Sequence, residues 1–403
     1  AMVAIFVGRA NDDYYRGVRD ETIHEFYVYV ELPEEETCED PEPMVGKLLK
    51  TMYGTVDASH VWQDDYIGLT SSRGFQKGIS IPAVLYHADR QMQAEVHGDG
   101  FGVIMKKSQG GWLDEVLSRH DFKVAGLPSS RATSEQSVVY LNRVPVWGPI
   151  QWSAYLEADA RRVKKVIRDL GLESAKEVTA PAVRLSVSDV PKTDRESQKL
   201  DDEKVKTYRS VTMRIMCPSL DRSDIGYGRE YAGEGGCCFH RRGSVCCDSD
   251  CAGGPTARRS RSGMAMLWGS HLLKHGSAVH STVGLGSGEA EYYALLRGSW
   301  HGFGVKAMLR DLGAGASDDA ELQIFSDSSA ARGILSRRGL GADRRIDVRF
   351  LWLQERVQNE KMLLKTIEGY WIPADLSTKT LDQETTGRLL RLISFTMKAD
   401  GNV

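Results

Sequence analysis

The sequence predicts an α/β chain (mixed α+β), with an incomplete sheet domain first and a layered α/β domain last. Its composition, 41% hydrophobic and 27% charged over 403 residues, is typical of a folded, soluble protein. In the last third, three β-rich segments precede a long helix, after which strand and helix alternate, as in a layered α/β domain. Residues 184–207 are polar and have few apolar anchors. We therefore expect two folded parts joined by a linker.

The first part is expected to contain three strands and two helices. Residues 26–32 (FYVYVEL) alternate and are β-rich, so they predict a strand. Helix-spaced apolar residues predict helices over 44–74 and 153–171. Residues 83–88 and 94–105 have the pattern of two strands around a turn. This hairpin would carry an Asp near its tip.

The last third begins with three predicted strands, at 243–250, at 263–268 and around 278–285. A helix should follow from about Ser287 to Leu312, because Ser287 is a favourable N-cap and Gly313 ends the pattern. The remaining expected elements are a strand over 322–327, a short helix over 328–336, a helix over 346–359 and a strand over 362–370.

The charge of the chain is unevenly distributed. The net charge is -3, but residues 255–262 and 332–349 are basic, whereas 191–203 and 311–321 hold much of the acid. Binding of a phosphate backbone needs a locally positive surface and not a positive total. Charge alone supports a nucleic-acid interface and ordinary solvated loops about equally.

The seven cysteines predict neither a disulfide framework nor a zinc site. Their number is odd, and the chain has no signal peptide. The five cysteines between 237 and 251 have the spacing CC-x7-CC-x3-C, and adjacent residues of a strand point to opposite faces, which suits a tetrahedral site poorly.

Since the chain has neither a signal peptide nor a long apolar segment, we expect an intracellular protein, cytoplasmic or nuclear, that contacts no membrane. The chain opens with Ala1 inside a predicted strand, so we expect that an upstream part is missing.

Four acidic residues have the positions that a metal site requires. Asp248 lies in the first strand of the last third, Glu291 in the first turns of the long helix, and Asp327 at the end of LQIFSD. Asp375 follows in WIPADLSTK. Carboxylates at strand ends and helix starts can converge on one point, and their hard oxygens suit Mg²⁺ or Mn²⁺. Taken singly, each is more often a solvated surface acid.

The last third also resembles a known family. The blocks GSHLLKHGSAVHSTVGLGSGEAEYYALL, IFSDSSAARGILSRRGLGADRRIDVRFLWLQERV and YWIPADLSTKTL follow CCDSDCAGGPTARRSRSGMAML in the order and spacing of the ribonuclease H domain of copia-type retrotransposon Pol polyproteins. The match spans about residues 243–395. It implies a three-layer α/β fold, a site of two Mg²⁺ or Mn²⁺ ions without a small-molecule cofactor, and hydrolysis of RNA in RNA–DNA hybrids. By the resemblance, the catalytic and metal-binding residues are Asp248, Glu291, Asp327 and Asp375.

Two other acids compete with these assignments. Asp250 faces the same side of its strand as Asp248, so it is either a second-layer residue or solvated. Glu289 points elsewhere from Glu291 on a helix and is better explained as an N-terminal acid favoured by the helix dipole. The chain also departs from the family pattern at Cys251 and at 344–347, where Arg replaces His. None of these departures removes a ligand.

A basic turn near the first strand is a candidate phosphate contact, with a solvated turn as an equal alternative. It carries Arg258, Arg259 and Arg261.

The earlier part resembles the reverse transcriptase of the same elements. Residues 28–36, 46–75 and 83–103 follow its fingers and palm segments in order. The family's palm needs one early Asp, which would fall at or just before Ala1, and an Asp–Asp pair, of which only Asp99 is present. Because one carboxylate cannot hold two metal ions, we expect a degraded polymerase site and no DNA synthesis.

These patterns predict four segments: an incomplete reverse-transcriptase-like domain over 1–182, a truncated connection over 183–242, a ribonuclease-H-like domain over 243–395 and a tail over 396–403. The shortened connection predicts poorly docked halves and marginal stability. The expected function is a metal-dependent ribonuclease H attached to an inactive polymerase. The alternative is a catalytically inactive relic that at most binds nucleic acid.

Overall fold

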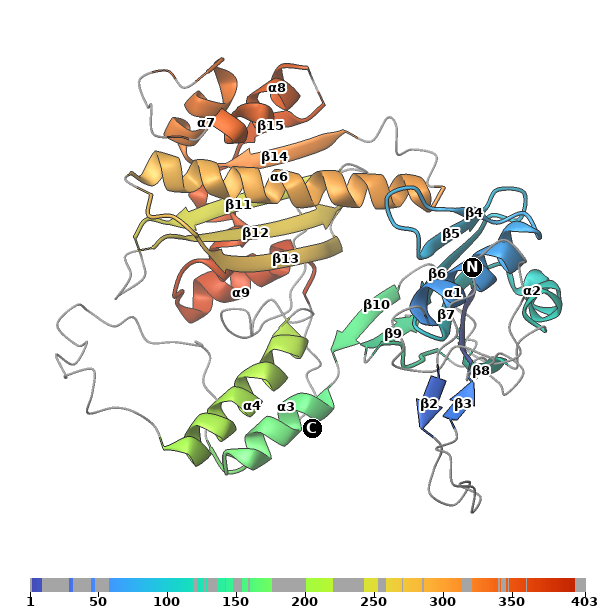
Figure 1. Ribbon diagram of the computed structural model, residues 1–403. Helices are drawn as coiled ribbons and strands as arrows, with labels where there is room; N and C mark the ends of the chain where they lie inside the picture. Colours follow the sequence, from blue (N-terminus) through green and yellow to red (C-terminus); the bar gives the residue numbers. More distant parts are fainter. Residues whose placement is uncertain are drawn as a thin grey trace. The chain divides into compact units, whose positions relative to one another are not determined.

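In a computed structural model, shown in Figure 1, the chain divides into two compact units. The first comprises Ala1–Glu157 with Met308–Ala314, and the second Ala158–Ala307 with Gly315–Val403. The residues that the structure describes are 2–8, 29–31, 45–47, 58–118, 122–126, 128, 136–141, 143–147, 154–158, 160–175, 201–219, 243–252, 259–269, 271–284, 286–313, 321–339, 341, 346, 348–359 and 361–395. The mixed α/β class expected from the sequence is confirmed.

The first unit contains a six-stranded antiparallel sheet of order β4-β5-β6-β7-β1-β8. Its strands are β1 (Met2–Gly8), β4 (Gln76–Lys77), β5 (Val84–His87), β6 (Met92–His97), β7 (Gly100–Met105) and β8 (Phe122–Gly126). Two short pairs accompany it, β2 (Tyr29–Glu31) with β3 (Val45–Lys47), and β9 (Arg143–Trp147) with β10 (Ala154–Ala158).

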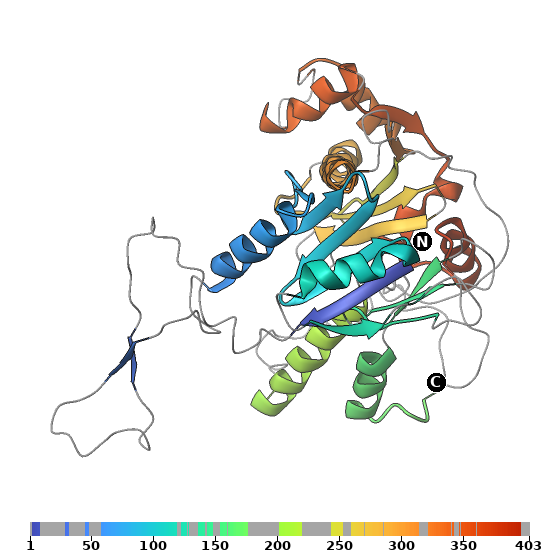
Figure 2. The same cartoon turned by 90° about the vertical axis from the view of Figure 1, so that its right-hand side faces the viewer.

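Helices α1 (Ala58–Ser71) and α2 (Gly110–Leu117) cover the first sheet, with the 3₁₀ turn η3 (Lys107–Gln109) leading into α2. Figure 2 shows α2 lying across the strands. Alternate residues of β6 and β7 are buried, so one face of the sheet supplies the core that the helices complete. On α1, Trp62 and Tyr66 both meet Phe101 edge-on, with ring centroids 6.4 and 5.8 Å away.

Three expectations for the first part are wrong in detail. Val45–Lys47 is a strand and not helix, because it pairs with β2. The expected strand 94–105 is split into β6 and β7 by a tight turn, which Gly98 permits by adopting φ +60°. Residues 154–158 of the expected helix 153–171 form β10, which pairs with β9, and the helix is α3 (Ala160–Asp169). Such pairings join distant segments, so local spacing does not reveal them.

The second unit is built on a five-stranded sheet of order β13-β12-β11-β14-β15. Its strands are β11 (Gly243–Asp250), β12 (Arg261–Trp268), β13 (His271–Val279), β14 (Leu322–Ser326) and β15 (Leu363–Thr366). The first three are antiparallel, whereas β14 runs parallel to β11 and β15 parallel to β14. The carboxyl ends of β11 and β14 therefore meet at the same edge of the sheet.

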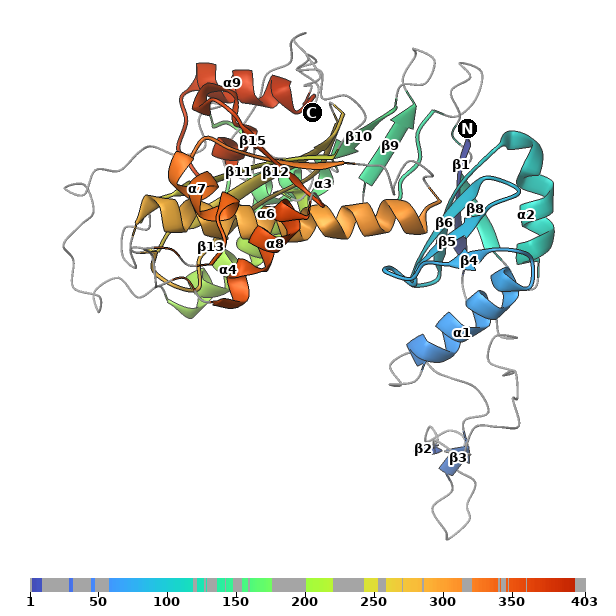
Figure 3. The same ribbon diagram turned by 90° about the horizontal axis from the view of Figure 1, so that it is seen from above.

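Helices cover both faces of this sheet, which gives three layers (Figure 3). One face carries α6 (Ser287–Asp311), α7 (Ser329–Ser336) and α8 (Trp352–Gln358), the last preceded by the 3₁₀ turn η4 (Val348–Leu351). The other carries the 3₁₀ helix η6 (Pro373–Ser377) and α9 (Gln383–Leu392), and η5 (Gly369–Trp371) lies between β15 and η6 in the chain. Successive residues of β11 alternate between the two cores, Val245 and Cys247 in one and Cys246 in the other.

Helix α6 packs directly against the sheet at two of its glycines. A Cβ on Gly298 would lie 2.3 Å from Cys247 Sγ, and one on Gly302 would lie 2.9 Å from Leu322 Cδ2. No larger residue fits at Gly298 without displacing Cys247. This close approach brings the start of α6 within reach of the sheet edge.

Most expectations for the last third are confirmed: β11, β12, α6, β14 and α7 lie within a few residues of the expected positions. The third strand is wrong, since β13 lies at His271–Val279 and not around 278–285. It is an edge strand without fully buried residues, so it has little apolar alternation in its sequence. Within the expected connection, residues Asp202–Ser219 form helix α4, whose Arg214 pairs with Asp169 of α3. The described helices include none that is both long and apolar enough to cross a membrane.

A candidate metal centre

Three acids converge at the edge of the second sheet where β11 and β14 end. β11 pairs with β14 as far as Cys246 opposite Phe325, and continuing this register by two residues sets Asp248 level with Asp327. Glu291 reaches the same point from the start of α6. One carboxylate oxygen from each of Asp248, Glu291 and Asp327 can be chosen so that all three lie within 4.8 Å of one another. The structure thus brings together three of the four expected ligands.

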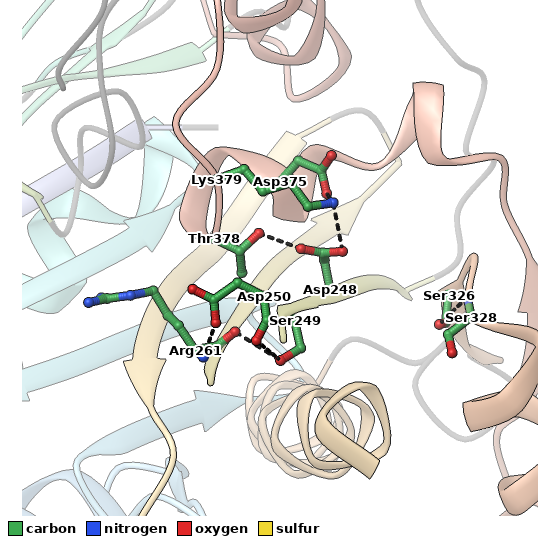
Figure 4. Close-up of polar contacts among 9 residues, drawn as sticks. All are labelled: Asp248, Ser249, Asp250, Arg261, Ser326, Ser328, Asp375, Thr378 and Lys379. Atoms are coloured by element: carbon green, nitrogen blue, oxygen red, sulfur yellow. Dashed lines mark hydrogen bonds and ion pairs between the residues drawn. The ribbon is translucent and has the colours of Figure 1, made fainter. Parts of the chain in front are cut away.

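Asp248 is buried, at 1% exposure, and its carboxylate is held from the η6 side (Figure 4). Thr378 Oγ1 donates to Asp248 Oδ2, and Lys379 Nζ donates to Asp248 Oδ1 over 3.1 Å. Gly263 of β12 lies directly opposite Asp248 and makes this possible. A Cβ there would lie 2.6 Å from the backbone oxygen of Ala374, so any side chain would push η6 away.

Asp375, the fourth expected ligand, is outside the three-acid group among the described residues. It lies in η6, and its Oδ1 accepts a hydrogen bond from Lys379 Nζ over 2.7 Å. Lys379 therefore bridges Asp375 and Asp248, as the dashed lines in Figure 4 show.

Burial and mutual repulsion make these acids hard to ionise together. Burial, reinforced by Asp248 and Asp327, raises the pKa of Glu291 to about 8. Burial and the charge of Asp248 likewise raise the pKa of Asp375 to about 7, against the opposing effect of Lys379. Burial opposes the charge of Lys379, but Asp248 and Asp375 outweigh it and raise the pKa of the ammonium. A cation bound among these acids would favour their ionised forms and so lower these pKa values.

The residues fit a divalent cation, and one atom indicates where it would bind. Glu291 Oε2 is buried and has no hydrogen-bond partner in the described part of the chain. A buried carboxylate oxygen left without a donor is costly unless something positive approaches it. The carboxylates of Asp248, Glu291 and Asp327 together form the all-oxygen donor set that Mg²⁺ and Mn²⁺ prefer.

The two competing acids have structural roles. Asp250 Oδ1 accepts a hydrogen bond from the backbone N–H of Arg261 and so stabilises the β11–β12 pair. The sequence alone predicts either that Asp250 lies behind the metal ligands or that it is solvated. Glu289 lies in the first turn of α6 as expected, but it is buried, and its Oε1 accepts from Tyr293 Oη over 2.9 Å. The helix dipole alone therefore does not explain why a glutamate lies at position 289.

The expected phosphate-contacting arginines differ in their surroundings. Arg258 lies outside the described residues, and Arg259 is exposed. Arg261 is only partly exposed and donates from Nη1 to Ser277 Oγ over 3.1 Å, so it links β12 to β13.

Asp99, the expected remnant of a polymerase site, lies in the turn between β6 and β7. Trp62 Nε1 donates to the Gly98 carbonyl of this turn over 2.6 Å. Within the described ranges, Asp99 belongs to no group of three or more His, Cys, Asp or Glu residues that could share an ion.

Sequence reasoning missed Thr378 and Lys379. A signal was present, because Asp375 and Lys379 are four residues apart in WIPADLSTK, a spacing that often brings opposite charges together.

Sequence reasoning also missed a pair of aromatic residues beside the acids. Tyr370 and Trp371 are 53% and 41% exposed, and they follow Gly369, where a Cβ would lie 3.1 Å from Asp327 Oδ2.

No known family profile matches the chain. Over 400 residues it is 24% identical to the "Retrovirus-related Pol polyprotein from transposon TNT 1-94" of Nicotiana tabacum. This match covers 88% of the chain, which spans 28% of the polyprotein's length. The chain is thus related to retrotransposon Pol polyproteins, as its motifs predicted.

Two solved structures are similar at low identity. The foamy viral protease-reverse transcriptase in complex with dsDNA is 10% identical with a TM-score of 0.41, covering 91% of this chain and 68% of that one. LC11-RNase H1, isolated from compost, is 16% identical with a TM-score of 0.22, covering 32% of this chain and 86% of that one. Likenesses this weak carry no argument about the site.

Proposed function

We propose that the second unit is a metal-dependent ribonuclease that hydrolyses the RNA strand of RNA–DNA hybrids, within a chain derived from a copia-type Pol polyprotein. The observation that carries this proposal is the convergence of carboxylate oxygens of Asp248, Glu291 and Asp327 within 4.8 Å of one another. One oxygen of Glu291 also has no hydrogen-bond partner in the described part of the chain. The relationship of the chain to a Pol polyprotein favours a nucleic acid as the substrate. On this basis, residues 243–395 form the ribonuclease-H-like domain and residues 1–182 the remnant of a reverse transcriptase.

Asp248, Glu291 and Asp327 would hold the ion, which supplies Lewis-acid chemistry for phosphodiester cleavage. The chain's own residues orient these ligands. Thr378 and Lys379 fix both oxygens of Asp248. The N–H of Ser249 hydrogen-bonds to Glu291. Asp327 is positioned at the start of α7, where Ser328 Oγ caps the helix by accepting from Ala331 N–H.

A surface beside the acids suits a nucleic-acid strand. The rings of Tyr370 and Trp371 meet edge-on at 4.7 Å, and the Arg388 guanidinium lies 3.5 Å above the Tyr370 ring centroid. Exposed aromatic rings can stack on bases or sugars, and arginine contributes positive charge for phosphates. Because Gly369 adjoins Asp327, a strand on this surface would pass close to the ion site.

We further propose that the first unit has lost polymerase activity. A two-ion polymerase site needs at least two carboxylates. Asp99 lies in a turn whose Gly98 carbonyl accepts a hydrogen bond from Trp62 Nε1. Gly98, which precedes it, has φ +60° and serves the reversal of the chain.

The test is cleavage of an RNA–DNA hybrid, labelled on the RNA, by the full chain with Mg²⁺ or Mn²⁺. We expect the native chain and the matched control Asp99→Asn to cut the RNA, and Asp327→Asn to lose cutting, because Asp327 holds the ion and Asp99 does not. Circular dichroism would verify that each variant is folded. Absence of cutting by the folded native chain would favour the inactive relic that at most binds nucleic acid.

A further inference from the structure

The ammonium of Lys379 lies between Asp248 and Asp375, two of the four acids that are expected from the sequence to hold two metal ions. Its Nζ lies 3.1 Å from Asp248 Oδ1 and 2.7 Å from Asp375 Oδ1, so one ammonium contacts two carboxylates from different elements. Figure 4 shows it between them, on the η6 side of Asp248. An ammonium is a compact point charge with three donors, which suits it to bridging two carboxylates.

The two sides of the centre differ in whether their carboxylate oxygens have hydrogen-bond donors. On the η6 side, both oxygens of Asp248 and one oxygen of Asp375 have donors. On the α6 side, Glu291 Oε2 has no donor in the described part of the chain. One side is therefore already supplied with a positive charge, and the other is not.

The contacts of Lys379 support a single ion. A second ion between Asp248 and Asp375 would have to displace the ammonium from two charge-assisted hydrogen bonds, which are about twice as strong as neutral ones.

We propose that Lys379 acts as a built-in second cation, so that the chain binds one divalent ion, at Asp248, Glu291 and Asp327. This inference rests on the proposed metal-dependent function and replaces the expectation of two ions. Lys379 is a positioning residue: it holds Asp375 and Asp248 in place.

The experiment is isothermal titration of the full chain with Mn²⁺ in the absence of nucleic acid. The native chain should bind one ion, and Lys379→Met, which keeps an unbranched side chain one atom shorter and removes its charge, should bind two. Lys379→Arg should still bind one. The matched control is Lys365→Met, because Lys365 is exposed on β15, away from these contacts.

Two ions bound by the native chain would overturn the proposal without any variant. One ion bound by a folded Lys379→Met chain would overturn it too, since the lysine would then not exclude the second ion. Adding Asp375→Asn to Lys379→Met should return the count to one, because the vacated position loses its second carboxylate. Failure of the proposed function is distinguishable: one bound ion without hybrid cleavage would contradict the ribonuclease but leave the lysine's role intact.

Discussion

The two sheets of this chain are each covered by a helix, and the helices approach them differently. In the first unit, α1 packs through the large rings of Trp62 and Tyr66, and a Cβ on its Gly68 would meet nothing within 4 Å. In the second unit, α6 packs through Gly298 and Gly302, where a Cβ would collide with the sheet. The close-packed helix α6 contributes an acid, Glu291, to the three-acid group at the edge of its sheet.

The strand ends differ as well. β6 and β7 are antiparallel and joined by a tight turn, so the one acid there, Asp99, has no matching acid from a parallel neighbour. β11 and β14 are parallel, so both end at the same edge and deliver Asp248 and Asp327 side by side. An acid at a strand end becomes a candidate site only when sheet order and helix approach supply companions. The following predictions test this contrast, from the largest expected effect to the smallest.

The largest effect should be on stability against pH in the metal-free chain. The pKa of Glu291 is raised from 4.5 to about 8 in the folded state, so folding is favoured while the group is protonated. Stability should therefore fall as pH rises across this interval, by a few kcal/mol at most, roughly 1.4 kcal/mol for each pH unit. Glu291→Gln should reduce this slope to the part that Asp375, whose pKa is also raised, contributes, whereas Asp99→Asn should leave the slope unchanged. Denaturant unfolding in EDTA measures it, and a native slope retained by Glu291→Gln would contradict the assignment.

The next effect concerns stabilisation by Mg²⁺. An ion that binds only the folded state stabilises by about 2.7 kcal/mol at a hundred times its Kd. We expect the native chain and Asp99→Asn to show a rise in Tm with Mg²⁺, and Asp248→Asn to show none. Differential scanning calorimetry with and without the ion makes the measurement. An equal rise in all three would place the ion elsewhere.

A smaller effect should follow from filling the space between α6 and β11. Gly298→Ala would place a methyl group against Cys247 Sγ, and overpacking of this kind costs about 1–3 kcal/mol. Gly304→Ala, on an exposed position of the same helix with nothing within 4 Å, should be neutral or stabilise by up to about 1 kcal/mol. The free energy of unfolding of both variants decides the matter; equal values would mean that the close approach of α6 is unimportant.

Much of the second unit was predictable because its patterns are local. The strand GSVCCDSD and the helix from Ser287 to the glycine stop at Gly313 follow from β propensity, capping and spacing. The half-exposed edge strand β13 was misplaced because no apolar face marks it. In the first part, local spacing predicts helix at β3 and β10, but each forms a strand by pairing with a partner elsewhere in the chain.

The sequence by itself determined which acids stand at the ends of elements: Asp248 near the end of one strand, Asp327 after another, and Glu291 early in a helix. Only the tertiary structure decided which of them meet. It placed Asp375 on Lys379 instead of within the three-acid group, and it left a Glu291 oxygen without a donor. The reason is physical. Propensity and spacing act over a few residues, whereas distances between carboxylates depend on strand order, parallel pairing and the depth to which glycines let a helix approach a sheet.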